Sequence, residues 1–134
     1  MEINVSTENG RVPVIILQVD GSIDSSTSAI FKAKANELIK GGGRYFLIDL
    51  SEAPFISSTG LGVLHDIFNQ LRQLHPDANL NEQEMRQGIN AGTYKSPHLK
   101  LLNLSPRARS AFEMAGFDMY IETFTDRAKA IASF

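Results

Sequence analysis

The chain has 134 residues, 13 basic and 15 acidic side chains, a net charge of −2 and no cysteine. This length suits one domain with a single core, so we predict one domain over residues 1–134. Without cysteine, disulfides and thiolate chemistry are excluded. The scattered basic residues argue against direct nucleic-acid binding. No apolar run approaches the roughly 20 residues of a membrane span, and the start lacks signal-peptide features, so we expect a cytoplasmic protein without membrane insertion.

An antiparallel hairpin is predicted at the start of the chain. Ile3 and Val5 alternate with polar neighbours, which indicates a strand, and Glu-Asn-Gly-Arg at 8–11 is a hairpin turn signal. The apolar run at 12–19 predicts the second strand. Pro13 fits a strand start or an edge, because proline cannot donate to a ladder.

A first helix is predicted from about Asp24, as its cap, to Lys40, with a stop at the three glycines 41–43. The glycine run follows the helix and lacks the Lys-Ser or Lys-Thr of a nucleotide-binding loop. We therefore interpret it as a helix end.

The most informative segment is Phe-Ile-Ser-Ser-Thr-Gly-Leu-Gly at 55–62. An apolar run at 45–50 precedes it and predicts a buried strand. Apolar residues at spacings of three and four follow it and predict an amphipathic helix that ends near Leu74. Ser57 or Ser58 is the expected N-cap of this helix.

A helix start with free hydroxyl groups is suited to carry a phosphate. The first N–H groups of a helix are unpaired and stabilise an anion. A phosphate on one of these hydroxyls would add about 1.5 to 2 negative charges. Gly60 and Gly62 would allow a partner or another backbone to approach the first turn closely.

A polar segment at 77–97 separates this helix from the rest of the chain. It is longer than the connections of compact domains, and residues 82–89 could form a short helix, ended by Gly88 or Gly92, or stay mobile. The segment could select a partner or be a neutral surface loop.

The last third of the chain predicts two further strands and two further helices. A strand is expected at 99–104, followed by a helix with Ser105 as N-cap and an end at Gly116. A final strand is expected at 119–124, and Asp126 should cap a last helix that runs to Ala132.

The sequence resembles the STAS family of anti-sigma factor antagonists at four places, in the family's order. Gly21-Ser22-Ile23-Asp24 is similar to the turn after the family's second strand, with serine where the family usually has glutamate. Residues 47–51 are similar to its central strand, 55–62 to its phosphorylation loop, and 101–117 to its fourth strand and third helix.

The resemblance implies an α/β fold of the STAS type, in a single STAS domain over 1–134. Such a fold is a mixed, mostly parallel sheet of about four to five strands with about four helices and an antiparallel N-terminal hairpin. Family members cross the region of 77–97 in a few residues, so the resemblance implies an insertion at about 77–97, which we interpret as residues 79–93.

The resemblance also implies site residues. The phosphate acceptor falls on Ser58, with Ser57 and Thr59 as alternatives. Ser57 stands where the family usually has aspartate, which leaves the role of that carboxylate in doubt. The partner-binding positions that match are Asp24, Ser57, Thr59, Gly60, Leu61 and Gly62.

The function implied is that of a bacterial partner-switching regulator. The unmodified domain would bind an anti-sigma factor with serine kinase activity and release a sigma factor, and a PP2C-type phosphatase would remove the phosphate. An alternative is a STAS scaffold subunit that is never phosphorylated, in a transporter or signalling complex. A third possible function is direct binding of a nucleotide by the domain, but the sequence contains no phosphate-loop motif.

Neither an enzyme nor a metal or cofactor site is expected. The three histidines, His65, His75 and His98, lack metal-ligand spacing. Asp49 could pair with the hydroxyls of the loop, bind Mg²⁺ in a kinase complex or cap the turn at Ser51. Without a base-activated nucleophile or cofactor fingerprint, we predict no catalysis.

Overall fold

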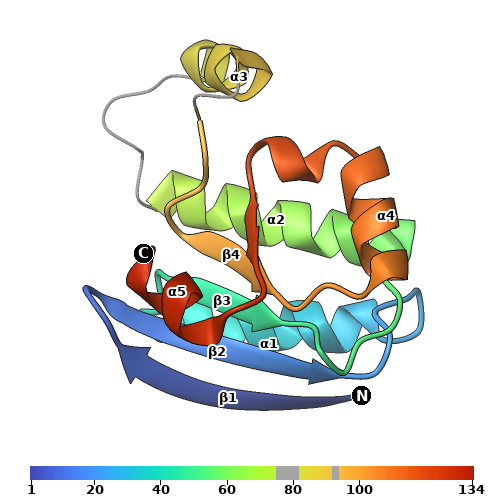
Figure 1. Ribbon diagram of the computed structural model, residues 1–134. Helices are drawn as coiled ribbons and strands as arrows, with labels where there is room; N and C mark the ends of the chain where they lie inside the picture. Colours follow the sequence, from blue (N-terminus) through green and yellow to red (C-terminus); the bar gives the residue numbers. More distant parts are fainter. Residues whose placement is uncertain (75–81, 92–93) are drawn as a thin grey trace.

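A five-stranded mixed sheet forms the centre of the computed structural model, which describes residues 1–74, 82–91 and 94–134 (Figure 1). The elements in chain order are β1 (Glu2–Asn9), β2 (Pro13–Asp20), α1 (Ser28–Lys40), β3 (Phe46–Asp49), α2 (Ser58–Leu74), α3 (Glu82–Ala91), β4 (Leu99–Leu102), α4 (Pro106–Met114), the 3₁₀ helix η1 (Phe117–Met119), β5 (Glu122–Phe124) and α5 (Arg127–Ala132).

The strands lie in the order in which they occur in the chain, β1-β2-β3-β4-β5. β1 and β2 are antiparallel, and every later pair is parallel. Pro13 is the first residue of β2, where the ladder does not need its missing N–H. The predicted mixed, mostly parallel sheet with an antiparallel hairpin is confirmed.

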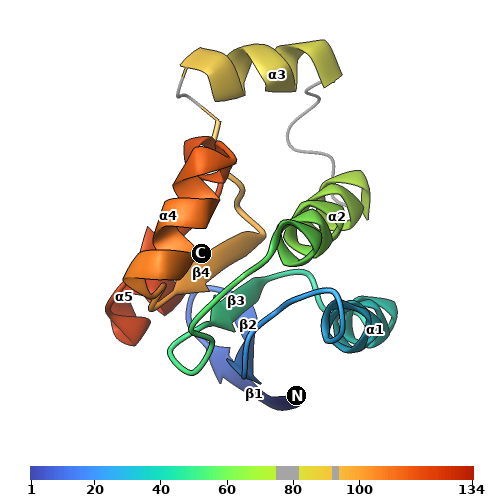
Figure 2. The same cartoon turned by 90° about the vertical axis from the view of Figure 1, so that its right-hand side faces the viewer.

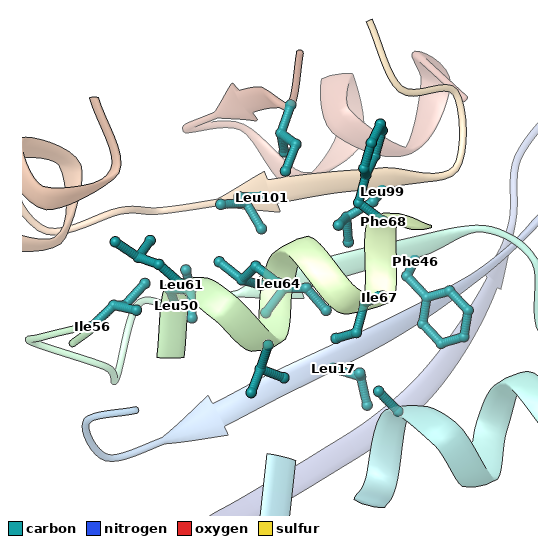
Figure 3. Packing of buried hydrophobic residues seen from close by; sticks show 14 of the residues in the cluster. Leu17, Phe46, Leu50, Ile56, Leu61, Leu64, Ile67, Phe68, Leu99 and Leu101 are labelled. Carbon is teal, nitrogen blue, oxygen red and sulfur yellow. The ribbon is translucent and has the colours of Figure 1, made fainter. Parts of the chain in front are cut away.

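The main core lies on the face of the sheet that α1, α2 and α4 cover (Figure 2). Figure 3 shows the apolar face of α2 turned towards the sheet, as the spacing of its apolar residues requires. The α2 residues buried in this core are Leu61, Val63, Leu64, Ile67, Phe68 and Leu71.

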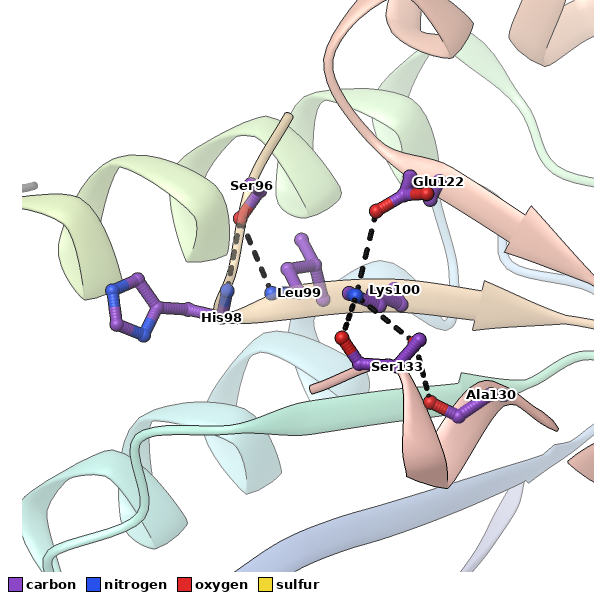
Figure 4. A network of polar contacts seen from close by, with 7 residues as sticks. All are labelled: Ser96, His98, Leu99, Lys100, Glu122, Ala130 and Ser133. Carbon is purple, nitrogen blue, oxygen red and sulfur yellow. Dashed lines mark hydrogen bonds and ion pairs between the residues drawn. The ribbon is translucent and has the colours of Figure 1, made fainter. Parts of the chain in front are cut away.

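The opposite face of the sheet is covered by α5. A smaller cluster there joins Ala130 and Ile131 of α5 to β-strand residues such as Ile16 and Leu47. Lys100 is 3 % exposed on this face. Its Nζ donates to the carbonyl of Ser133 at 2.9 Å and pairs with Glu122 at 3.4 Å (Figure 4). The buried charge thus holds the C-terminal residues against the sheet.

Two predicted boundaries were wrong. α1 begins at Ser28 and not near Asp24, because Asp24 closes a turn of its own before the helix, as described below. The last strand begins at Glu122 and not at residue 119. The backbone N–H groups of Tyr120 and Ile121 both donate to the carbonyl of Phe117, at 3.2 and 2.9 Å, so the chain turns there before it extends.

Helix α3 forms within the segment that the sequence marks as an insertion, which gives one α-helix more than the four expected. It continues through Gly88, one of the two predicted ends, to Ala91. Figures 1 and 2 show it apart from the other helices, and Ile89 packs against the main core. The predictions for His75 and for an end at Gly92 lie outside the described residues, and the insertion itself stays a prediction.

No helix within the described ranges is long and apolar enough to cross a bilayer.

Candidate functional site

The loop before α2 lies beside the loop before α1. Ile23 and Ile56 form an isolated parallel bridge. The N–H of Ile23 donates to the carbonyl of Phe55 at 3.0 Å, and the N–H of Ser57 donates to the carbonyl of Ile23 at 2.8 Å. Two of the segments that carry the family resemblance, 21–24 and 55–62, are therefore brought together by backbone hydrogen bonds.

Ser57 is the residue that caps α2. Its Oγ accepts a hydrogen bond from the N–H of Gly60 at 3.2 Å, and its carbonyl accepts one from the N–H of Leu61 at 2.9 Å. The sequence allowed either Ser57 or Ser58 as the N-cap, and the structure shows that Ser57 is the cap. The Ser57 hydroxyl therefore caps the helix without adding a charge.

Ser58 and Thr59 are the first two residues of α2, and both are exposed. Neither side chain makes a hydrogen bond with the described part of the chain. The N–H groups of this first turn have no carbonyl one turn earlier in the helix to bind, so they favour an anion nearby. The Ser58 hydroxyl is accessible to a modifying enzyme.

Asp24 lies directly after Ile23, next to this helix start. Its Oδ1 accepts hydrogen bonds from the hydroxyl and the N–H of Ser26, at 2.7 and 2.9 Å, and from the N–H of Thr27 at 3.2 Å. The hydrogen bonds from Ser26, and then those from Thr27, lower the pKa of Asp24 below its ordinary value, because they stabilise the carboxylate. Asp24 thus adds a fixed negative charge beside the site.

The two glycines of the loop have different environments. A Cβ on Gly60 would lie 2.7 Å from the carbonyl oxygen of Ile23, so glycine allows α2 to approach the neighbouring loop. A Cβ on Gly62 would have nothing within 4 Å. Leu61 is 7 % exposed and belongs to the core. Of these predicted partner-binding positions, Gly62 is on the surface, and Gly60 and Leu61 hold the helix in place.

A shallow hollow of about 540 Å³ lies between the first turns of α1 and α2. Lys32 of α1 and Asp66 of α2 form an ion pair across it at 3.2 Å. The hollow is lined by Ser28, Ala29, Lys32, Thr59, Gly62, Val63, His65 and Asp66. The contribution of α1 to this surface was not predicted, because the sequence shows no motif on that helix.

The start of α4 holds the loop from the other side. The Ser105 hydroxyl donates to the carbonyl of Pro54 at 2.9 Å. The guanidinium carbon of Arg107 lies 4.3 Å from the centroid of the Phe55 ring, a cation–π contact. Sequence reasoning missed Arg107 as a neighbour of the loop, since only the tertiary structure brings α4 there.

The remaining polar candidates have structural contacts. Oδ1 of Asp49 accepts from the N–H of Ser51 at 3.0 Å, which is the turn-capping alternative of the sequence. Nδ1 of His65 shares a hydrogen bond of 3.1 Å with the hydroxyl of Tyr120. His98 is buried in the loop before β4, and its Nδ1 lies 3.2 Å from the carbonyl oxygen of Arg44. The described residues contain no cluster of three or more potential metal ligands.

A family model and a bacterial protein match this sequence over most of its first half and most of its length, respectively. The STAS domain model matches residues 5–75. The Bordetella bronchiseptica protein "Putative anti-sigma factor antagonist BtrV" is 26% identical over 121 residues, which are 90% of this chain and 86% of that protein. The aligned residues thus make up most of both chains.

Solved structures share the fold at low sequence identity. The Thermotoga maritima protein tm1081 is described as a "putative anti-sigma factor antagonist". Its structure has a TM-score of 0.71 at 15% identity, over 96% of this chain and 91% of its own. The Bacillus anti-sigma factor antagonist SpoIIAA, unphosphorylated, has a TM-score of 0.68 at 15% identity over 97% of this chain and 93% of its own. Its phosphorylated form has a TM-score of 0.63 at 15% identity, over 97% of this chain and 96% of its own.

The family match spans just over half of the sequence, and it includes β1 from Val5 onward, β2, α1, β3 and the whole of α2. The arrangement of the sheet and helices agrees with it. The chain belongs to the STAS domain family.

Proposed function

We propose that this protein is an anti-sigma factor antagonist that is switched by phosphorylation of Ser58. The observation that supports this function best is the exposed hydroxyl of Ser58 at the first residue of α2, directly after the cap Ser57. The name of BtrV and the two forms of SpoIIAA, unphosphorylated and phosphorylated, support the same function by analogy.

The unmodified domain binds an anti-sigma factor with serine kinase activity and thereby releases a sigma factor, in the cytoplasm where sigma factors act. The surface it uses consists of Ser58, Thr59 and Gly62 with the adjoining hollow of α1 and α2. This surface is nearly neutral, since Lys32 and Asp66 compensate each other at 3.2 Å. The ATP chemistry belongs to the kinase, and the domain acts as its substrate and ligand.

A phosphate on Ser58 would add about 1.5 to 2 negative charges to this surface. The charge of Asp24 is already held in the adjacent loop. A partner surface that accepts a neutral hydroxyl would therefore have to accommodate the added negative charge and the larger phosphate group, which weakens binding. A PP2C-type phosphatase would restore binding.

A STAS scaffold that is never phosphorylated is the second candidate. The specific observation that favours it is Ser57, which caps the helix but brings no carboxylate to orient an acceptor or to contact a kinase. A scaffold would bind its partner through the same surface in all conditions.

The first experiment maps phosphate on the protein isolated from its own cells and compares capture of the partner by three proteins. These are the unmodified wild type, Ser58→Ala and Ser58→Asp, with Ser110→Ala as the control at an exposed serine of α4. The captured partner is then incubated with ATP and the wild type. Phosphate on Ser58, with capture retained by Ser58→Ala and reduced by Ser58→Asp, supports the switch.

The two candidates predict different results. If no phosphate occurs in any growth condition and all variants capture the partner equally, the switch is wrong and the scaffold remains. Phosphate on Ser57 or Thr59 instead of Ser58 would support the phosphorylation switch but assign the acceptor to another residue.

A further inference from the structure

The strand β1 forms a free edge of the sheet, because it pairs with β2 on one side only. The pairing is uninterrupted from Glu2 opposite Asp20 to Asn9 opposite Pro13, so the strand has no bulge. It contains neither proline nor lysine, which often protect edge strands against pairing with another chain. In Figures 1 and 2, no described segment covers this edge.

The register shows which backbone groups of β1 point outwards. Ile15 of β2 donates its N–H to Tyr45 at 2.9 Å, which is towards β3 and away from β1. In an antiparallel pair of strands, two opposite residues either both point their backbone N–H and C=O groups at each other or both point them away from the partner strand. Thr7, opposite Ile15, therefore directs its N–H and C=O away from β2. The direction of the backbone groups alternates along a strand, so the N–H and C=O groups of Val5 and Ile3 also point away from β2.

Next to these outward backbone groups, on the face of the sheet that α1 covers, lies an apolar strip formed by residues of β1 and α1. Val5 of β1 is 41% exposed, and Ile30 of α1 is 49% exposed. Met1, Ile3 and Ala33 join Ile30 in lining a shallow hollow of about 470 Å³. Its rim carries one cation and one anion, Lys34 and Glu37, at 3.5 Å from each other.

We propose that a second copy of this chain pairs with this edge, β1 against β1 and antiparallel, about a twofold axis perpendicular to the sheet. The outward N–H and C=O groups require an extended strand as the occupant. A twofold axis places the apolar strips of both copies on the same face, where each covers the other's Val5 and Ile30. The paired rim charges are self-complementary across such an axis.

The charges of β1 also disfavour one of the possible registers. With Asn4 at the axis, Ile3 lies opposite Val5 of the second copy, and no acidic residue lies opposite another. With Val5 at the axis, Glu2 would lie opposite Glu8 of the second copy, and like charges opposite each other are destabilising. The register centred on Asn4 is therefore favoured over the one centred on Val5.

The dimer leaves the site at the start of α2 accessible. The hollow beside Thr59 uses Ser28, Ala29 and Lys32 of α1, whereas the strip uses Ile30, Ala33 and Glu37 of the same helix. Each dimer would therefore present two copies of the candidate site, independently of whether Ser58 is phosphorylated.

Sedimentation velocity over a series of concentrations from about 5 to 500 μM tests the dimer, because interfaces of small area bind in this range. The mass should rise from 14.8 kDa to twice that value. Thr7→Pro removes an outward N–H and spares the ladder with β2. Ile30→Lys places a charge on the strip, and Leu74→Lys is its control, since Ile30 and Leu74 are both 49% exposed.

We expect Thr7→Pro and Ile30→Lys each to weaken dimerisation at least tenfold, and Leu74→Lys to leave it unchanged. Amide hydrogen exchange adds a readout for single residues: the amides of Ile3, Val5 and Thr7 should become protected as concentration rises, and those of Asn4 and Ser6 should not change. A monomer at all concentrations, a dimer that tolerates both substitutions, or protection without this alternation would overturn the proposal.

Discussion

At the scale of residues, Ser57 and Ser58 carry adjacent hydroxyl groups in different situations. The Ser57 hydroxyl accepts the N–H of Gly60 at 3.2 Å and caps α2. The Ser58 hydroxyl is exposed and has no partner in the described part of the chain. One serine therefore stabilises the helix start, and the other is available for modification.

Substitution separates these two tasks. Ser57→Ala should lower the free energy of unfolding by about 1 kcal/mol, because the first turn loses its cap. Ser57→Asp should restore that stability, since aspartate caps as well as serine does, and Ser58→Ala should stay within about 0.5 kcal/mol of the wild type. Urea unfolding followed by circular dichroism measures all three. Equal losses in Ser57→Ala and Ser58→Ala would contradict the assignment of the cap.

Tyr120 gives a prediction for alkaline pH. Burial raises the pKa of Tyr120 from 10.0 to about 12, because desolvation disfavours the phenolate. The folded state holds this proton more tightly than the unfolded chain, so the contribution to stability is complete below pH 10.0 and is lost as the pH rises towards about 12. Tyrosinate absorbance should show a late transition that Tyr120→Phe lacks. A midpoint for Tyr120 near 10.0 would contradict this expectation.

Some roles of single residues could not be read from the sequence. Asp49 had three possible roles, and only the position of the Ser51 N–H, 3.0 Å from its Oδ1, identifies a turn cap. Arg107 and Lys32 were not predicted as neighbours of the site. Each lies on another helix, and contacts between distant segments leave no local pattern in the chain.

At the scale of elements, the first turn of α2 is fixed by its approach to the loop at Ile23. Gly60 permits this approach, and the bridge between Ile23 and Ile56 holds the two loops together. The sequence predicted both glycines as places of close approach. The structure assigns the close contact within the protein to Gly60 alone and leaves Gly62 open to solvent.

Gly60→Ala and Gly62→Ala form a matched pair. Gly60→Ala should destabilise the protein by about 1 to 3 kcal/mol, because the new Cβ overlaps with the Ile23 carbonyl and forces the helix to shift. Gly62→Ala should be neutral or stabilising by up to about 1 kcal/mol, as expected for an exposed helix position. Thermal unfolding measures both. A loss of stability in Gly62→Ala as large as that in Gly60→Ala would contradict this account.

At the scale of the whole molecule, the sheet has helices on both faces, and α3 adds little to either. Within the described residues, its hydrophobic contact with the main core is Ile89, which is partly buried. The strand order is continuous from β3 to β4, so the segment that carries α3 is a connection outside the sheet.

Replacement of residues 79–93 by a short glycine-serine linker should therefore keep the fold. We expect a loss of about 1 kcal/mol, corresponding to the partial burial of one isoleucine, and a single cooperative unfolding transition. Differential scanning calorimetry and the capture assay described for Ser58 would follow the effect on stability and on partner binding. Unfolding of the shortened chain at room temperature would show that the segment belongs to the core.

The sequence by itself determined most of the elements and their order, because local signals define them: the turn after the first strand, the helix stop at 41–43, and the caps at Ser105 and Asp126, which the structure confirms. It also indicated the family through the segment 55–62. Only the tertiary structure decided which hydroxyl caps α2 and which is exposed, which glycine is needed for packing, and that α1 and α4 border the site. These depend on distances between segments far apart in the chain, which packing sets and no local pattern records.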